Sequence, residues 1–285
     1  KNTKKTTKKS GWRRFFTWFG ITVLVLMLAG AGVLGFAYAT VKLPDPNADF
    51  QTNTSFVYFN DGKEKLGSYQ IQNRQTLAYE DIPQNVKDAI VAGENRTFWT
   101  DPGISIPGIA RAVVSVVRGE DVVGGSTITQ QYIKVLYLTQ DKSYTRKFTE
   151  ILLAAKVGNE LSKEQILEGY LNTVYFGRGA YGVEAASQAF FGKPAAKLTD
   201  AQAIALTAMI NDPGNLDPAQ GKKQAADLLE RYQYTINGMV EMGKLTEAQK
   251  AEMYDALPKF PEVERDSQFG GPKGFLLNMV QTELR

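Results

Sequence analysis

Gly124-Gly125-Ser126-Thr127-Ile128-Thr129-Gln130-Gln131 is the stretch around which this chain of 285 residues is organised. Its two glycines permit a close approach of backbone to a ligand, and its hydroxyl and amide side chains can donate and accept hydrogen bonds. An apolar run at helical spacing follows in residues 132–138. We predict a glycine turn, a Ser/Thr cap and a helix whose first N–H groups meet an anion. The alternative is an ordinary helix cap without a ligand.

The composition excludes several kinds of catalytic site. The chain has no histidine and no cysteine, which rules out a Ser-His-Asp triad, a cysteine nucleophile and zinc bound by imidazole or thiolate. Its formal net charge of +3 is small and argues against a general role in nucleic-acid binding. Acid–base chemistry in this chain must therefore use Asp, Glu, Lys or Tyr.

The N-terminal part has the pattern of a membrane anchor. All charged residues of the tail 1–14 are basic, and residues 15–41 carry no charge. At ~1.5 Å per residue the uncharged run is longer than the ~30 Å hydrocarbon core of a bilayer. We predict one transmembrane helix over 15–41, with the tail in the cytoplasm and the rest of the chain outside. The alternative is a cleaved signal peptide, because Ala37-Tyr38-Ala39 fits a small-residue cleavage pattern.

The remaining sequence predicts one short hairpin followed by helices. In a connector over 42–80, residues 56–59 and 65–71 flank the turn signal Asn60-Asp61-Gly62. Residues 81–258 show helical periodicity and form the predicted globular domain. Capping boxes are predicted at Ser162 with Gln165, Thr199 with Gln202, and Thr246 with Gln249. The expected fold class is mainly α, preceded by one transmembrane helix and a short β-hairpin.

The octet 124–131 is one of several ordered segments that resemble the motifs of peptidoglycan glycosyltransferases, the transglycosylase domains of class A penicillin-binding proteins and their monofunctional relatives. The other segments are residues 94–99 with 103 and 108–112, residues 146–150, and residues 163–172 with 175–177. The resemblance covers roughly residues 56–218. It implies a lysozyme-like helical glycosyltransferase domain.

Glu94 is the first of two carboxylates that carry the predicted chemistry. It ends a predicted helix just before Phe98 and Trp99, a setting that suits acid–base work near neutrality. From the residues alone, an exposed Glu94 paired with Arg96 or Arg111 is the alternative. The resemblance makes Glu94 the general base that takes the proton of the acceptor sugar hydroxyl.

Glu150 is the second carboxylate. It follows Arg146 by four residues and Lys147 by three, so the three side chains can share one helix face in ordinary ion pairs. The resemblance makes Glu150 the second acidic residue of the site, near the leaving diphosphate and a ligand of a divalent cation. Mg²⁺ is expected because it prefers carboxylate and phosphate oxygens.

Cationic residues between the octet and Glu150 are expected to stabilise the negative charge that develops on a diphosphate leaving group. The residues assigned to substrate binding are Ser126, Thr127, Gln130, Gln131, Lys134, Lys142, Arg146, Lys147 and Lys163. For any one of the cations the alternative is a solvated surface charge. The apolar residues of 107–117 are either buried core or, by resemblance, a place where a lipid tail enters.

Some positions differ from the usual family pattern. Asn95, Asp101 and Ser105 stand where Asp, His and Asp are usual, and Lys142 stands where Arg is usual. The first three surround Glu94 in the sequence and leave open how the base is adjusted. Lys142 keeps the charge but lacks the two-pronged hydrogen bonding of arginine.

The resemblance implies an inverting glycosyltransferase that polymerises lipid II, with release of undecaprenyl diphosphate, at the outer face of a bacterial cell membrane. Expected partners are lipid II, the growing glycan strand, the membrane, moenomycin-type inhibitors, and cell-wall elongation or division proteins, with no nucleic acid. The alternatives are a lysozyme-like lytic glycosidase and a catalytically weak, membrane-anchored scaffold. Residues 259–285 resemble a linker toward a transpeptidase domain, which we expect to be absent because the sequence has no Ser-x-x-Lys.

Overall fold

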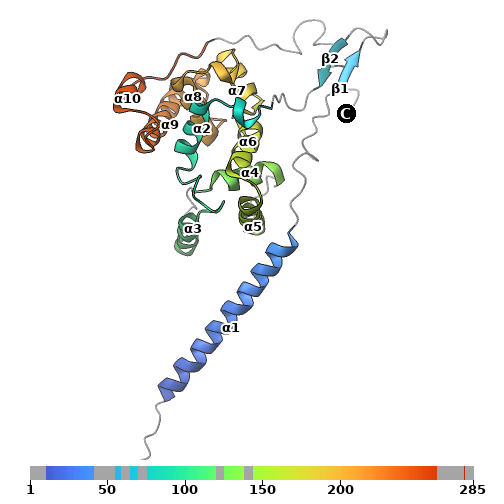
Figure 1. Cartoon of the computed structure of the whole chain (residues 1–285), viewed down its shortest axis with the longest axis vertical. Helices are drawn as coiled ribbons and strands as arrows, with labels where there is room; N and C mark the ends of the chain where they lie inside the picture. The colour runs from blue at the N-terminus through green and yellow to red at the C-terminus, as the bar shows by residue number, and fades with distance from the viewer. Residues whose placement is uncertain are drawn as a thin grey trace, which may run out of the picture. The chain divides into compact units, whose positions relative to one another are not determined.

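The computed structural model of the protein describes residues 11–41, 55–58, 65–69, 76–119, 125–137, 144–261 and 279. These residues are mainly α-helical (Figure 1), which confirms the predicted fold class. The chain divides into two compact units, residues 1–43 and residues 44–285. The boundaries predicted within the second unit stay predictions.

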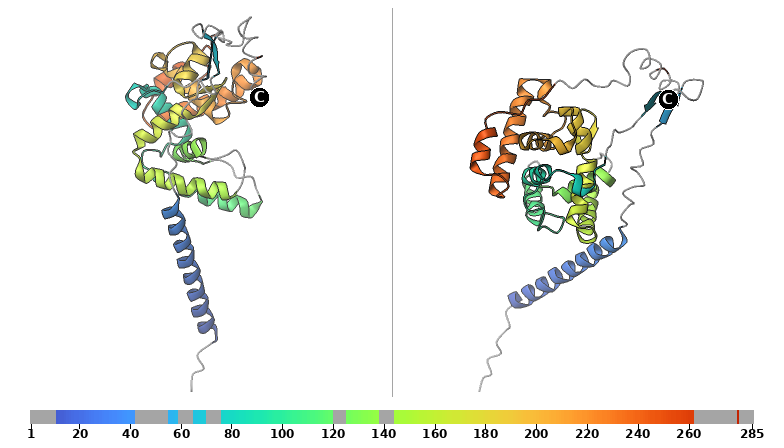
Figure 2. Two further views of the ribbon diagram at one scale, coloured as in Figure 1. Left: turned by 90° about the vertical axis from the view of Figure 1, so that its right-hand side faces the viewer. Right: turned by 45° about the horizontal axis from the view of Figure 1, so that its top comes forward.

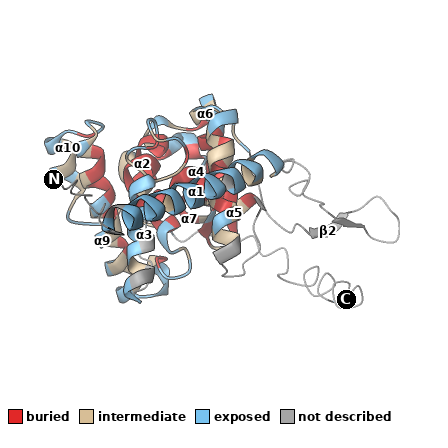
Figure 3. Cartoon of the chain, turned by 90° about the horizontal axis from the view of Figure 1, so that it is seen from below, coloured by how far each residue is buried: buried red, intermediate tan, exposed pale blue. Residues whose placement is uncertain are grey.

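The first unit is a single long helix, α1 (Gly11–Thr40). Within it, Arg14–Thr40 is long and apolar enough to cross a membrane, with a mean hydropathy of 2.3 in its most apolar window. Its described side chains are mostly exposed (Figure 3). The predicted helix over 15–41 is thus present, beginning earlier at Gly11.

Two small antiparallel hairpins accompany the helices. Strand β1 (Ser55–Tyr58) pairs with β2 (Lys65–Tyr69), which confirms the first predicted hairpin, although its turn lies outside the described residues. Strands β3 (Tyr175–Gly177) and β4 (Ala180–Tyr181) form a second hairpin that was not predicted. These strands are too short for an alternating pattern to reveal them.

The rest of the second unit is helical. Its longer helices are α2 (Gln84–Glu94), α3 (Ile106–Arg118), α4 (Ile128–Tyr137), α5 (Tyr144–Glu160), α6 (Lys163–Thr173), α7 (Val183–Phe191), α8 (Asp200–Ala208), α9 (Lys222–Glu241) and α10 (Glu247–Met253). Short 3-10 helices are η1 (Tyr79–Asp81), η2 (Ala195–Lys197), η3 (Met209–Asn211) and η4 (Pro218–Gln220). The capping boxes predicted at Ser162, Thr199 and Thr246 are all present.

Two groups of helices meet near the end of α2. In the first group, α2 packs against α8 and α9. Its core contains Ala89, Ala92, Ile204, Ala205, Tyr232, Ile236, Met239 and Leu245. In the second group, α4 packs against α5 and α6. Figure 2 shows α8–α10 in orange and red on one side and α4–α6 in green and yellow on the other. The last residue of α2, Glu94, lies between them.

Arg178 and Asp217 form a buried ion pair that joins the β3–β4 turn to the segment before η4. The Arg178 Nη2 to Asp217 Oδ1 distance is 2.6 Å, and the two side chains are 11% and 7% exposed. Arg178 also lies over the ring of Phe190, 4.3 Å from its centre. The pair therefore links two loops that lie far apart in the sequence.

We expect Arg178→Ala to lower the free energy of unfolding by about 3–5 kcal/mol, because it leaves the Asp217 carboxylate buried and without its cation. The matched control is Lys223→Ala, which removes an exposed pair with Asp227. That change should cost no more than about 0.5 kcal/mol. Urea unfolding of the detergent-solubilised protein, followed by circular dichroism, measures both. Equal effects of the two substitutions would contradict the structural role of Arg178.

Candidate active site

Glu94 is held by two side chains from different helices. Gln131 of α4 donates through Nε2 to Glu94 Oε2 at 2.7 Å, and Arg231 of α9 donates through Nη2 to Glu94 Oε1 at 2.8 Å. The same Arg231 nitrogen lies 2.6 Å from the carbonyl oxygen of Gly93. The Glu94 side chain is only 10% exposed. A carboxylate removed from water to this extent needs such partners. Each of its two oxygens accepts one of these bonds and keeps a lone pair for a ligand.

The alternative in which Glu94 is exposed and pairs with Arg96 or Arg111 is wrong. Arg96 instead forms an ion pair with Glu241 and lies over the ring of Tyr234, 4.8 Å from its centre. Arg231 was missed because it lies far along the chain from Glu94, on a helix without a recognised motif. Only the packing of α2 against α9 brings the two together.

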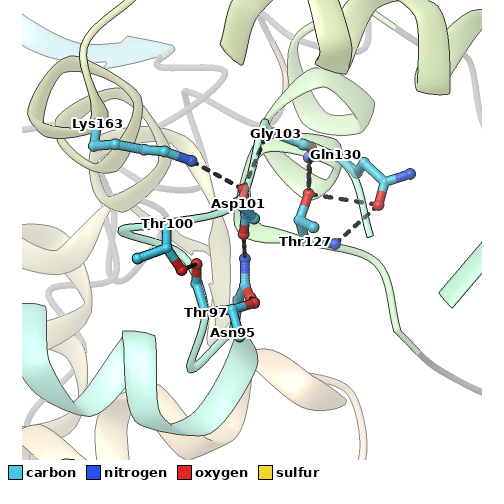
Figure 4. Close-up of polar contacts among 8 residues, drawn as sticks. All are labelled: Asn95, Thr97, Thr100, Asp101, Gly103, Thr127, Gln130 and Lys163. Atoms are coloured by element: carbon cyan, nitrogen blue, oxygen red, sulfur yellow. Dashed lines mark hydrogen bonds and ion pairs between the residues drawn. The ribbon is translucent and has the colours of Figure 1, made fainter. Parts of the chain in front are cut away.

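A second buried carboxylate, Asp101, organises the loop after Glu94 (Figure 4). Asp101 accepts hydrogen bonds from Asn95 Nδ2 at 2.7 Å, from the N–H of Gly103 at 2.8 Å and from Lys163 Nζ at 2.9 Å. Lys163 also lies over the ring of Phe98, 4.6 Å from its centre. The unusual residues Asn95 and Asp101 therefore bind each other, and Asp101 also binds Lys163, whereas Glu94 has its own partners.

Gly103 brings this loop against its neighbours. Its φ of +87° is in the left-handed region, and a Cβ at this position would lie 2.6 Å from the carbonyl oxygen of Ala154 in α5. A side chain here would force the backbones apart. The third unusual residue, Ser105, accepts a hydrogen bond from the N–H of Gly108 at 3.0 Å and so caps α3.

The octet forms the predicted cap at the start of α4. Thr127 Oγ1 accepts from the N–H of Gln130 at 3.1 Å, and Gln130 Oε1 accepts from the N–H of Thr127 at 3.0 Å. Thr127 Oγ1 also donates to the carbonyl oxygen of Gly103 at 2.7 Å, as Figure 4 shows. Both side chains are buried. Their observed contacts are structural, and substrate contact by either one stays a prediction.

Ser126 of the octet is connected to Glu150 through Lys147. Lys147 Nζ donates to Ser126 Oγ at 3.1 Å and forms an ion pair with Glu150. Arg146 lies 3.6 Å from the other oxygen of Glu150, whose side chain is 2% exposed. The predicted shared helix face is confirmed. Two cations thus surround one buried carboxylate, which leaves a local excess of positive charge.

Lys134 and Lys142 are two further residues assigned to substrate binding. Lys134 is exposed on α4, with its ammonium accessible to a ligand. Lys142 lies outside the described residues.

The described residues do not form a ready-made metal site. They contain no group of three or more His, Cys, Asp or Glu side chains arranged to hold an ion. Both oxygens of Glu150 face cations instead, on Lys147 and Arg146. Among the described residues, a divalent cation at this position would therefore find one carboxylate, and substrate phosphates could supply other ligands.

Tyr170 of α6 lies behind Gln131. Its hydroxyl donates to Gln131 Oε1 at 2.7 Å, and its ring is fully buried. Burial raises the pKa of the Tyr170 hydroxyl well above its usual value, the charge of Glu94 raises it further, and Arg231 opposes that shift. The phenol therefore keeps its proton. The sequence does not predict this hydroxyl contact.

A polar cavity of about 560 Å³ borders Arg231. Its lining comes from residues 211–216 and from α9, including Asp227, Glu230 and Tyr234. Acidic side chains outnumber basic ones in the lining, which disfavours a diphosphate there. Arg231 thus connects Glu94 with this cavity, since it binds the carboxylate and also lines the cavity.

Residues 62–240 match the model of the family described as Transglycosylase. The chain belongs to the transglycosylase family. Penicillin-binding protein 1A of Mycolicibacterium smegmatis is 36% identical over 271 residues, which cover 93% of this chain and 34% of the relative. Penicillin-binding protein 1A of Mycobacterium tuberculosis is also 36% identical, over 93% of this chain and 33% of the relative. The chain thus spans about a third of the length of these relatives.

Among solved structures, penicillin-binding protein 1A from Haemophilus influenzae aligns with 82% of this chain and 24% of its own. The TM-score is 0.44 and the sequence identity 18%. Similarity at this level adds nothing to the family assignment, which comes from the sequence.

For this transglycosylase domain, the ion pair with Asp101 predicts that Lys163 is needed for stability. We expect Lys163→Met to lower the free energy of unfolding by about 3 kcal/mol, because the Asp101 carboxylate is 8% exposed and loses its cation. Asp101→Asn in the same chain should recover part of that loss. Urea unfolding gives the stabilities. Unchanged stability with a raised KM for lipid II would instead support the sequence prediction that Lys163 binds substrate.

Proposed function

We propose that this chain is a peptidoglycan glycosyltransferase that polymerises lipid II into glycan strands, with Glu94 as general base. The family match supports the reaction class. The observation in this structure that supports the role of Glu94 is its setting: a nearly buried carboxylate that Gln131 holds at one oxygen and Arg231 at the other, where Arg231 also lines a polar cavity. In this proposal the acceptor sugars bind on the side of that cavity and the donor diphosphate binds beside the cations of α5.

In the proposed reaction, a carboxylate oxygen of Glu94 takes the proton of the acceptor 4-hydroxyl. The hydroxyl oxygen attacks the anomeric carbon of the growing strand from the face opposite the diphosphate, so the configuration inverts. The bond from that carbon to the diphosphate oxygen breaks, and its electron pair leaves with undecaprenyl diphosphate. Arg231 and Gln131 hold the base in place, since each binds one of its oxygens.

The cationic group on α5 is placed to stabilise the leaving diphosphate. Arg146 and Lys147 lie beside Glu150, and Lys147 reaches Ser126 at the start of the octet. Charge that develops in the transition state is stabilised by groups already in position. Lys134 and Lys142 belong to the same proposal. Lys163, in contrast, already binds Asp101.

A divalent cation, Mg²⁺ by its preference for carboxylate and phosphate oxygens, is part of the proposal as a companion of the diphosphate. Glu150 would be its protein ligand. It would neutralise phosphate charge.

The membrane arrangement is also a proposal. Helix α1 would anchor the chain with residues 1–14 in the cytoplasm and the glycosyltransferase domain outside. Helix α3 exposes the apolar side chains Ile106 and Val114, 67% and 48% accessible, which supports the prediction that this region meets lipid. Moenomycin-type inhibitors and cell-wall elongation or division proteins remain proposed partners.

We expect Glu94→Gln to lower polymerisation by about 10²- to 10⁴-fold, the usual contribution of a general base, while lipid II still binds. The assay is turnover of labelled lipid II by the detergent-solubilised protein, with binding measured separately. The control is Glu241→Gln, which neutralises an exposed carboxylate away from the cavity. Parental turnover by Glu94→Gln would exclude Glu94 as the base.

The same assay separates the two alternatives. Soluble fragments released from finished cell wall would identify a lytic glycosidase. Binding of lipid II by the parent protein without any turnover would identify a scaffold. Polymer that moenomycin suppresses would support the proposed activity.

Removal of divalent cations tests the proposed role of Mg²⁺ in turnover. We expect EDTA to lower turnover at least about tenfold, and Mg²⁺ to restore it. Glu150→Gln should lower turnover and weaken the response to added Mg²⁺. Identical turnover with and without EDTA would remove the cation from the proposal and leave Glu150 as the residue that holds Arg146 and Lys147.

A further inference from the structure

We infer that Tyr170 is a positioning residue for Glu94 that acts through the side-chain amide of Gln131. The inference rests on the proposed function, in which Glu94 is the base. Three helices contribute one residue each: Tyr170 from α6, Gln131 from α4 and Glu94 from α2. The Tyr170 hydroxyl donates to Gln131 Oε1 at 2.7 Å, and Gln131 Nε2 donates to Glu94 Oε2 at 2.7 Å.

The direction of this chain of hydrogen bonds follows from the charge of Glu94. An ionised carboxylate only accepts hydrogen bonds, so Gln131 must turn its NH₂ group toward it. The amide oxygen of Gln131 then points at Tyr170 and needs a donor. The hydroxyl of Tyr170, which burial keeps protonated, supplies that donor. One polarity of the chain therefore satisfies all three groups.

Gln131 alone cannot select this orientation. The two ends of its amide are nearly the same size and differ only in hydrogen-bonding character. Without the Tyr170 hydroxyl, the amide oxygen would be buried next to the ring with no donor. Rotating the amide would not help, because its oxygen would then face the Glu94 carboxylate, which has no proton to donate. Either outcome loosens the carboxylate on its α4 side, and among the described residues Arg231 on the α9 side would be left to hold it.

Tyr170 contributes to the rate and not to binding in this scheme. Its side chain is fully buried and cannot touch substrate. Loss of its hydroxyl should therefore lower kcat and leave the KM for lipid II nearly unchanged. If Tyr170 were needed only for stability, its loss would not lower kcat at a temperature where the protein is folded.

The kinetic experiment is a double-mutant cycle of Tyr170→Phe and Gln131→Leu, with turnover of labelled lipid II by the full chain. We expect each single variant to lower kcat about tenfold, the effect of one lost hydrogen bond to a charged group or its support. The double variant should be no slower than Gln131→Leu alone, because Tyr170 acts through Gln131. A double variant whose fall in kcat equals the product of the two single falls would overturn the inference.

Tyr232→Phe is the matched control. Tyr232 is also fully buried, lies beside Arg231 on α9, and its hydroxyl has no hydrogen-bond partner among the described residues. We expect its kcat to stay within about twofold of the parent, since no bond is lost. A fall in kcat for Tyr170→Phe no larger than for Tyr232→Phe would also overturn the inference.

A second cycle, read by thermal unfolding, needs no turnover and so separates this inference from the proposed function. In Glu94→Gln the residue facing Gln131 can accept or donate, and the amide no longer has one required orientation. Tyr170→Phe should therefore shift the unfolding midpoint less in the Glu94→Gln background than in the parent. Equal shifts would overturn the inference even in a protein that makes no polymer, whereas unequal shifts would support it there.

Discussion

The nearly buried carboxylate of Glu94 is the constraint on which the site depends. A charge removed from water must be met by opposite charge or hydrogen bonds, and α2 alone provides neither at its last residue. The apolar packing of α2 against α8 and α9 brings Arg231 to one oxygen, and the docking of α4 brings Gln131 to the other. The core of the domain and the setting of Glu94 therefore arise from the same helix contacts.

Asp101 obeys the same rule a few residues later. Its buried carboxylate accepts hydrogen bonds from Asn95, from the N–H of Gly103 and from Lys163, so the loop between α2 and α3 is bound to α6. Thr127 adds a bond from the start of α4 to the carbonyl oxygen of Gly103. Segments that look like separate motifs in the sequence are thus one hydrogen-bonded unit that begins at Asn95, next to Glu94.

Features set by neighbouring residues could be predicted from the sequence. The capping boxes at Ser162, Thr199 and Thr246, and the ion pairs of Glu150 with Lys147 and Arg146, depend on spacings of three and four residues. The partners of Glu94 and of Lys163 could not be predicted from the sequence, because each partner lies on a distant element that only tertiary packing brings close. A lysine assigned to substrate from its motif thus turns out to face Asp101.

The octet shows why one stretch can signal both fold and chemistry. Thr127 and Gln130 turn inward and close the cap of α4, whereas Ser126 and Gln131 face Lys147 and Glu94. The cap fixes where the first turn of α4 begins, and the helical repeat then fixes where Gln131 points. An error in the cap would displace the amide that holds Glu94. The residues that shape the start of the helix therefore have to be neighbours of those that contact Lys147 and Glu94.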